Sequence, residues 1–534
     1  MLVKLQTFTL LGINAIPIEV EVDISPGEFN ITLVGLPAPV VKESIQRVNR
    51  ALENSGFPPP GNRILINLAP AELHKQAASF DLPFAMGFLA CTGRNRLEKL
   101  SEYAIVGELA LDGTLRPIRG ALSMAIECAK ISRSRKKPLG LILPAENAPE
   151  AAVVEEIDVI PVHSLAQTLA FLLGDLEIDP APSQIDEIYA KFSQYNSDFS
   201  DVRGQELAKR ALTIAAAGAH NILMIGPPGS GKTMLAKRLP TVLPSFLTHE
   251  SVETTRIYSS LGMINSEHPL MVTRPFRSPH HTISDAGMVG GGVTPTPGEI
   301  SLAHNGVLFL DELPEFSRRT LEVLRQPLED RQITISRALA SSTFPCDFML
   351  VAAMNPCPCG YRGDPRRQCS CSVPMIERYM SKISGPLLDR IDIHIEVPAV
   401  PFEELSGMHT GTSSDEIRRQ VVAARKIQAQ RFQQDMPQKE TEDDLTDVTY
   451  GAPSAHFYNA QMTSRKIRKH CQLDAQGIKL LRAAMNDFGL SARAHDKVLR
   501  IARTIADLEN SPKILVPHLT EAINYRILDR SLWI

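Results

Sequence analysis

The sequence predicts an α/β protein with several domains, and three observations support this. Short strands alternate with helices along most of the 534 residues. An apolar strand at 222–225 leads directly into a glycine-rich loop and a helix, which is typical of an α/β unit with a parallel sheet. The last part of the chain is mostly helical. We therefore expect an α/β domain at 1–175, a polar, Pro-containing linker at 176–200, a second α/β domain at 201–400 and a helical domain at 401–534.

The composition is that of an ordinary globular protein. Hydrophobic residues make up 43% and charged residues 22%, and the formal net charge is −4. This balance does not indicate a nucleic-acid binder, but it does not exclude one, because binding needs only a local basic patch. The start of the chain alternates like a strand and lacks the features of a signal peptide, and no stretch approaches 18 uninterrupted apolar residues. We expect a cytoplasmic protein with no membrane partner, in which thiols stay reduced.

The first domain has clear element signals. Residues 20–36 alternate like strands, 40–57 form a helical stripe ending at Gly56, and 63–70 read as another strand. A buried helix is expected at 79–93, and a hairpin turning at Asp112-Gly113 within 105–118.

The second domain opens with the strongest motif of the chain. Its residues match G-x-x-x-x-G-K-[ST]: Gly226, Pro227, Pro228, Gly229, Ser230, Gly231, Lys232 and Thr233. Glycines let backbone N–H groups approach phosphates, and a helix N-terminus favours their negative charge. Lys232 would reach the β- and γ-phosphates of ATP, and the Thr233 hydroxyl would ligate Mg²⁺. The alternative is a glycine-rich turn without a ligand, against which the strand–loop–helix context argues.

An acidic pair follows a second apolar strand at 306–310. Asp311 would hold the Mg²⁺ shell, and Glu312 would polarise the attacking water. Two acids after a strand could instead cap the next helix. Their place after the phosphate loop favours ATP hydrolysis.

Four further segments resemble those of AAA+ ATPases, and the resemblance covers the second and third domains. MLVAAMNP ends in Asn355, at the sensor-1 position, and DVRGQELAKRAL resembles the segment beside the adenine, with Val202 and Gly204. GPLLDRIDIHIEV resembles the arginine-finger segment, so Arg390 is expected to reach a neighbouring subunit's ATP. SARAHDKVLRIARTIADL resembles the sensor-2 helix, with Arg493 as the arginine acting in its own chain. For either arginine the alternative is a surface charge or a salt bridge.

Two segments indicate which branch of the AAA+ ATPases the chain resembles. RQITISRALASSTFPCDFML resembles the pre-sensor-1 hairpin of the magnesium-chelatase and MCM-helicase branch, and RPFRSPHHTISDAGMVGGG resembles that branch's helix-2 insertion. The resemblance implies that both point into the pore of a hexameric ring. As a set, their side chains favour DNA phosphates, although each alone reads as an ordinary surface residue: Arg274, Arg277, His280, His281 and Arg337.

The first domain resembles the α+β domain of Lon proteases. HKQAASFDLPFAMGFLACTG places Ser79 at the position of the nucleophile, but RPIRGAL places Leu122 where the catalytic lysine belongs. A Ser–Lys pair needs an amine to accept the hydroxyl proton. We expect no peptidase activity, while the nearby Lys75 leaves a rescue open.

A Lon-like domain before a magnesium-chelatase-type AAA+ core is the architecture of the YifB/ComM family, which the chain resembles over nearly its full length. The resemblance implies a hexameric ATP-driven helicase that promotes branch migration of transforming DNA. Its partners would be single-stranded and branched DNA, further copies of itself and recombination proteins. The rivals are a magnesium-chelatase motor subunit, whose family lacks the Lon-like domain, a sigma-54 activator, whose GAFTGA loop is absent, and an ATP-dependent protease.

Four of the eight cysteines lie in NPCPCGYRGDPRRQCSC: Cys357, Cys359, Cys369 and Cys371. The nine residues between the pairs can turn back, so four thiolates can converge on one zinc ion. The spacing C-x-C…C-x-C is not the usual C-x₂-C, and a redox pair or free thiols remain alternatives. A structural zinc would hold in place a basic loop that carries Arg362, Arg366 and Arg367.

Overall fold

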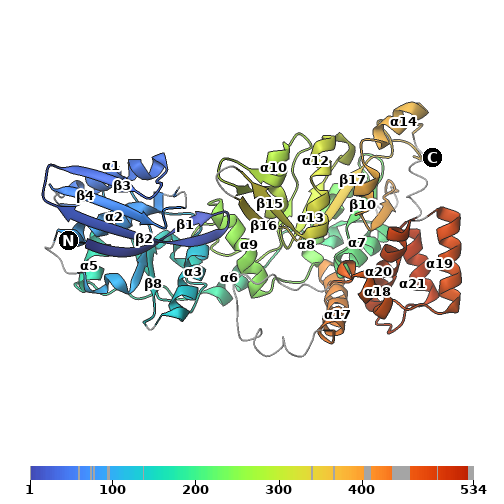
Figure 1. The fold of residues 1–534 in the computed structure, drawn as a ribbon. Coiled ribbons are helices and arrows are strands. Elements are labelled where there is room, and N and C mark those ends of the chain that lie inside the picture. The colour runs from blue at the N-terminus through green and yellow to red at the C-terminus, as the bar shows by residue number, and fades with distance from the viewer. Residues whose placement is uncertain are drawn as a thin grey trace.

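Two large β-sheets and a helical region follow one another along the molecule in the computed structural model (Figure 1). The structure describes residues 2–57, 61–72, 75, 78–92, 97–135, 137–337, 341–364, 367–401, 411–435, 458–489 and 491–526. A seven-stranded sheet belongs to the N-terminal region, and a five-stranded sheet belongs to the central region. In Figure 1 the C-terminal helices lie at the end of the molecule opposite the N-terminal sheet.

The N-terminal sheet is mixed and has the strand order β3-β4-β2-β1-β5-β8-β9. Its strands are β1 (Leu2–Leu11), β2 (Asn14–Ser25), β3 (Asn30–Val34), β4 (Arg63–Ala69), β5 (Tyr103–Ile105), β8 (Gly140–Pro144) and β9 (Val159–Val162). Its helices are α1 (Pro39–Asn54), α2 (Asp81–Cys91), α3 (Ala121–Ser134), α4 (Ala148–Ala151) and α5 (Leu165–Leu173). β2 pairs antiparallel with β1 and β4, and the remaining neighbours are parallel.

The elements predicted for this region form as expected. Alternate side chains of β2, such as Val20 and Val22, are fully buried, and every residue of α2 is buried. Strands β6 (Glu108–Leu109) and β7 (Leu115–Arg116) make the predicted hairpin. Asp112 Oδ1 accepts hydrogen bonds from the backbone N–H and the hydroxyl of Thr114 at its turn.

The predicted linker contains a helix that the sequence analysis did not anticipate. Helix α6 (Ile185–Phe192) has four apolar residues at helical spacing, and its Ile188 is buried against the N-terminal core. The stripe is short and lies among polar residues, so its helical period is easily overlooked.

The central sheet is parallel throughout, with the order β11-β14-β17-β10-β18. Its strands are β10 (Ile222–Ile225), β11 (Phe276–Arg277), β14 (Val307–Leu310), β17 (Met349–Met354) and β18 (Ile393–Glu396). The helices between them are α7 (Glu206–Gly218), α8 (Lys232–Val242), α9 (Thr248–Ser260), α10 (Asp285–Val289), α11 (Glu299–Leu302), α12 (Arg318–Glu322), α13 (Arg325–Asp330), α14 (Val373–Met380) and α15 (Gly385–Leu388). Alternate strand residues enter two separate cores, which explains the continuous apolar runs in the sequence.

Two small hairpins project from this region and touch each other. They are formed by β12 (Gly290–Gly291) with β13 (Thr296–Pro297), and by β15 (Gln332–Ser336) with β16 (Ser341–Pro345). A Cβ placed on Gly290 would lie 2.7 Å from Ile335 Cδ1. The β1–β2 turn of the N-terminal region also reaches the second hairpin, where a Cβ on Gly12 would lie 3.0 Å from Ser342 Cβ.

The C-terminal region is helical, as predicted. It contains α17 (Ser414–Gln433), α18 (Ser464–His470), α19 (Ala475–Phe488), α20 (Ala492–Leu508) and α21 (Val516–Asn524). Buried residues of these helices share one core with α7, α8 and one face of the central sheet. In the part of the chain that the structure describes, no helix has both the length and the apolar character to cross a membrane.

Candidate nucleotide-binding site

Three strands of the central sheet deliver the predicted nucleotide-binding residues to one edge. β10, β14 and β17 run parallel, with Ile225 opposite Met354 and Leu310 opposite Ala352. Their carboxyl ends therefore lie side by side, which is where open α/β sheets bind ligands. The phosphate loop follows β10, Asp311 follows β14, and Asn355 follows β17.

Lys232 joins two of these strand ends. Its Nζ donates to the carbonyl oxygens of Gly226 (2.7 Å) and Pro227 (2.9 Å) and lies 3.4 Å from Asn355 Oδ1. Burial lowers the pKa of Lys232, and the nearby Asp311 charge opposes this.

The loop itself has the shape of an anion cradle. Gly229 and Gly231 have φ angles of +79° and +91°, and a Cβ at either position would meet nothing within 4 Å. Their open side leaves room for phosphates to approach the backbone. Gly226 is needed for a close approach, because its Cβ would lie 2.1 Å from Val397 O.

The acidic pair lies beside Thr233 and a histidine. The Thr233 hydroxyl donates to Asp311 Oδ2 (2.7 Å), so the two predicted Mg²⁺ ligands are adjacent. Glu312 has the left-handed φ of 51°, and its side chain is 55% exposed. His281 Nδ1 lies 3.4 Å from Glu312 Oε2. His281 is predicted from the sequence to contact DNA, and its contact with Glu312 was not predicted because it depends on how β11 and β14 pair.

The segment before α7 also approaches the phosphate loop. Val202 is buried, and Gly204 has a φ of 63°. Gln205, which the sequence analysis missed, donates through Nε2 to the carbonyl oxygens of Ser230 (3.3 Å) and Pro398 (2.5 Å). Its place inside the segment DVRGQELAKRAL, directly after Gly204, is the signal in the sequence that could have indicated this role.

The four clustered cysteines converge next to this edge. The sulfur atoms of Cys357, Cys359, Cys369 and Cys371 all lie within 4.8 Å of one another. Backbone N–H groups of Tyr361 and Ser370 lower the pKa of the Cys359 thiol to about 5. Of the predicted basic residues of the loop, Arg367 covers the Tyr361 ring at 4.3 Å, and Arg366 lies outside the described residues.

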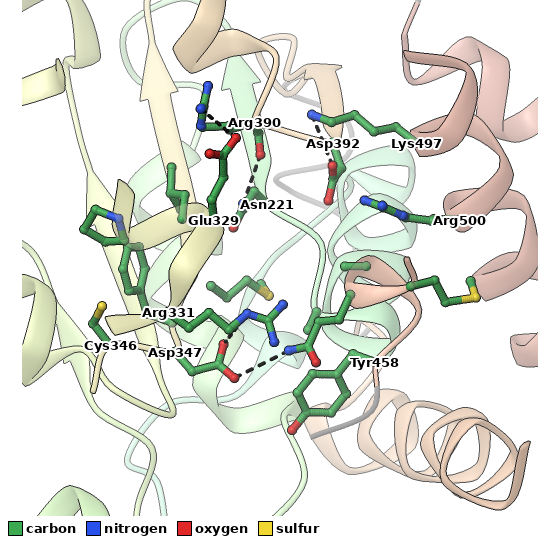
Figure 2. Close-up of a pocket in the computed structure, with 18 of the residues that line it drawn as sticks. Asn221, Glu329, Arg331, Cys346, Asp347, Arg390, Asp392, Tyr458, Lys497 and Arg500 are labelled. Atoms are coloured by element: carbon green, nitrogen blue, oxygen red, sulfur yellow. Dashed lines mark hydrogen bonds and ion pairs between the residues drawn. The ribbon is translucent and has the colours of Figure 1, made fainter. Parts of the chain in front are cut away.

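Arg390 and Arg493 lie at the opposite edge of the sheet. Both line a cavity of about 450 Å³ between the central and C-terminal regions, shown in Figure 2. Arg390 Nη2 lies 2.6 Å from Glu329 Oε1, and its carbonyl accepts from Asn221, just before β10. Arg493 Nη1 lies 3.7 Å from Asp389 Oδ2. A four-residue strand spans about 13 Å, so this position argues against the predicted role of Arg493 at the phosphate loop of its own chain.

Two of the arginines predicted to bind DNA have structural roles instead. Arg274 is 7% exposed and donates to Glu250 Oε2 (2.9 Å) and to the carbonyl oxygens of Pro244 and Asn305. Arg277 forms a two-pronged ion pair with Glu299, at 2.7 and 2.6 Å, which raises its pKa. Both guanidinium groups already have partners within the protein, which argues against the predicted DNA contact for these two residues.

The remaining residues predicted to contact DNA lie in two different places. His280 is exposed, and its ring lies 4.1 Å from that of His281, so the pair borders Glu312. Arg337 is exposed at the end of β15, and a Cβ on Gly291 would lie 3.3 Å from its Nη2. Arg337 is thus placed where the two hairpins meet. The tip at 338–340 lies outside the described residues.

The predicted peptidase positions do not form a Ser–Lys pair. Leu122 is fully buried, and its backbone N–H donates to Glu150 Oε1. Lys75 Nζ donates to the carbonyl oxygens of Gly35 (2.8 Å), Leu68 (3.1 Å) and Pro70. Ser79 Oγ is buried without a hydrogen-bond partner among the described residues. The ammonium group of Lys75 therefore donates its hydrogen bonds to backbone carbonyl oxygens.

Comparison with protein families gives three matches along the chain. Residues 20–147 match the subunit ChlI family of magnesium chelatase, 198–405 match the family described as magnesium chelatase, subunit ChlI, and 411–526 match the ChlI C-terminal family. Together with the phosphate loop and the parallel sheet, these matches define a magnesium-chelatase-like protein of the AAA+ ATPase class.

Similarity to individual proteins narrows this class. YifB of Escherichia coli is 43% identical, with 98% of this chain and 97% of YifB covered, and the competence protein ComM of Haemophilus influenzae is 42% identical with the same coverage. Lon protease 2 of Bacillus subtilis is 30% identical over 29% of this chain and 32% of its own. The chain belongs to the YifB/ComM family.

Proposed function

We propose that this protein is an ATP-driven DNA motor that acts in the cytoplasm as a hexameric ring and promotes branch migration. The observation that supports the motor most strongly is the meeting of Lys232, the Thr233–Asp311 pair and Asn355 at one sheet edge. The 42% identity to a competence protein over nearly the whole chain supports DNA as the partner. Recombination proteins are further partners under this proposal.

The residues at this edge have distinct roles in ATP hydrolysis. The backbone of 226–233 and the Lys232 ammonium hold the phosphates, and Val202 and Gly204 lie beside the base. Thr233 and Asp311 would hold Mg²⁺, and their oxygens fit a hard cation that prefers oxygen ligands. When bound, Mg²⁺ supplies charge neutralisation at the phosphates. Glu312 orients the attacking water, and Asn355 detects the γ-phosphate.

The second catalytic contribution comes from a neighbouring copy. Arg390 lies at the amino edge of the sheet, where Lys497 and Arg500 add positive charge (Figure 2). Arg493, at the start of α20, lines the same cavity. An arginine far from the phosphate loop of its own chain can act on ATP only across a subunit boundary. The ring therefore assembles each complete site from two chains.

DNA is held by the two touching hairpins. Arg337 is exposed at their junction and carries the positive charge that a DNA phosphate needs. Because β16 leads directly into β17 and Asn355, a change at the γ-phosphate can move the hairpin.

A paired measurement tests the proposal. ATP turnover and branch migration on a synthetic four-way junction are measured for the wild type, Lys232→Ala and Glu312→Gln. We expect Lys232→Ala to lose both ATP binding and turnover, and Glu312→Gln to keep binding but lose turnover and branch migration. Normal turnover in Glu312→Gln, or ATP hydrolysis without movement of the junction, would contradict the mechanism.

Specific observations favour or disfavour two other candidate activities, a magnesium-chelatase subunit and a protease. The family descriptions favour a magnesium-chelatase subunit, yet the 67 kDa subunit from Chlorobaculum parvum matches only 30% of this chain. A pulldown that recovers other chelatase subunits would favour that function. The Lon similarity favours a protease, and casein cleavage that disappears in Ser79→Ala would support it, whereas Leu122 and the carbonyl-bound Lys75 argue against it.

A further inference from the structure

We infer that the four clustered cysteines bind one zinc ion, and that this zinc holds part of the nucleotide site in its working shape. The inference rests on the proposed nucleotide site for its second half only.

The sulfur spacing fits one tetrahedral metal ion. Cys357 Sγ lies 3.4 Å from Cys359 Sγ and 3.7 Å from Cys369 Sγ, and the latter two lie 3.6 Å apart. Zinc–sulfur bonds of about 2.3 Å place tetrahedral sulfurs about 3.8 Å apart. A disulfide needs about 2.05 Å, and an iron–sulfur cluster spreads its cysteines over several iron atoms. One zinc ion fits these distances better than either.

The remaining ligand is also held in place. Cys371 Sγ lies 3.4 Å from the Cys359 backbone N–H, which is a typical way to orient a thiolate. Cys357 is buried, and the other three are partly exposed, so an ion can enter from the solvent side. The other four cysteines of the chain are buried singly elsewhere.

The cysteine loop packs on the phosphate loop. Gly360 has a φ of +85°, and a Cβ placed on it would lie 2.6 Å from Pro228 Cδ and 3.9 Å from Asn355 Cγ. The turn at 357–360, which carries the first two cysteines and ends at Gly360, therefore packs directly against the phosphate loop.

A closed path of contacts surrounds Asn355. Cys357 is two residues beyond it, and Cys371 is two residues before α14. The buried Tyr379 of α14 lies near the Asn355 backbone, because the N–H of Asn355 counteracts the rise that burial causes in the pKa of Tyr379. A metal that joins Cys357 to Cys371 would hold the segment after Asn355 to the segment before α14. Loss of the metal should therefore make Asn355 and the turn beside Pro228 more mobile.

The metal is tested by elemental analysis of the full chain purified without chelators. We expect one zinc and no iron per chain, with less than a fifth of the zinc remaining in Cys369→Ser and Cys371→Ser. Cys91→Ala, which removes a buried thiol outside the cluster, should keep its zinc. A wild-type chain without metal, with free thiols or disulfides at these positions, or with iron, would overturn the assignment.

The link to the nucleotide site is tested by two matched glycine variants. Gly360→Ala and Gly363→Ala impose similar backbone strain, since their φ angles are +85° and +80°, but only Gly360 has a neighbour within 4 Å. We expect both to keep zinc. Gly360→Ala should lower ATP turnover at least tenfold, and Gly363→Ala should stay within about twofold of the wild type.

Removing and restoring the ion completes the test. Zinc-stripped wild type should lose ATP turnover and regain it on addition of Zn²⁺ alone. Equal turnover in the two glycine variants, or full turnover without zinc, would overturn the link. If the wild type hydrolyses no ATP, the proposed function fails while the zinc measurement still stands.

Discussion

Arg274 and Arg337 belong to the same group of predicted DNA contacts, and their burial separates them. The Arg274 guanidinium lies inside the protein, paired with the buried Glu250, while Arg337 is exposed. The sequence shows an arginine in each segment, but only packing decides which one has donors left for DNA.

Removing Arg274 should therefore cost stability. In Arg274→Ala the buried Glu250 carboxylate loses its ion pair, which typically destabilises by about 3–5 kcal/mol. We expect a clear fall in the thermal unfolding midpoint. Arg337→Ala is the matched control and should unfold like the wild type. Unchanged unfolding of Arg274→Ala would show that this ion pair does not support the core.

Glu150 provides a pH-dependent prediction at the same scale. It is buried between the N-terminal and central regions, where it accepts hydrogen bonds from the Leu122 backbone N–H and from Ser259. Burial raises its pKa from 4.5 to about 6. A raised carboxyl pKa stabilises the protein below pH 4.5, and this contribution is lost as the pH rises through 6.

The variant Glu150→Gln cannot ionise, so its stability relative to the wild type should increase between pH 4.5 and pH 7. A shift of this size corresponds to about 2 kcal/mol. Thermal unfolding of both proteins at several pH values measures the difference. A difference that is constant with pH would show that Glu150 does not titrate in this range.

At the scale of elements, the β15–β16 hairpin connects the predicted DNA contact to the nucleotide site. Its inner face, including Ile333 and Phe344, is buried, and it continues into β17, which ends just before Asn355. The hairpin is thus supported on one side and free to present Arg337 on the other.

Arg337→Ala should reduce DNA affinity, DNA-stimulated ATP turnover and branch migration, while ATP binding and ring mass stay unchanged. Each lost phosphate contact should make the slope of log affinity against log salt less negative by about 0.9. Arg50→Ala, on the exposed surface of α1, is the control for loss of one positive charge. Junction movement at the wild-type rate would place the DNA elsewhere.

At the scale of the whole molecule, the proposed ring would give the two edges of the central sheet opposite roles. The carboxyl edge offers the phosphate loop, and the amino edge offers Arg390 and Arg493. Under the proposed function a single chain would hold an incomplete site, so activity should depend on how chains are combined.

Mixed rings test this arrangement. Arg390→Ala alone should lower ATP turnover by about 10³-fold or more, as for other arginine fingers. Mixing it with Lys232→Ala should restore part of the activity, because an intact phosphate loop can then face an intact arginine. The same rescue is expected for Arg493→Ala. Lys232→Ala mixed with Glu312→Gln should show no rescue, since every phosphate site stays defective. Absence of rescue with Arg390→Ala would place the finger in its own site.

The sequence by itself determined the local features of this protein. The strand–loop–helix at 222–242, the buried helix 81–91, the hairpin at Asp112-Gly113 and the strand that ends before Asp311 all formed as predicted. Each depends on neighbouring residues alone, through hydrophobic period, turn chemistry and the backbone freedom of glycine. The short helix α6 was missed because its apolar stripe is weak.

Only the tertiary structure decided which distant residues meet. It paired Arg274 with Glu250, set His281 beside Glu312, packed Gly360 on Pro228 and moved Arg493 to the edge opposite the phosphate loop. Such contacts arise from strand order and from the packing of helices on two faces of a sheet. A residue's type and its position along the chain do not specify these, because burial and partners belong to the folded whole.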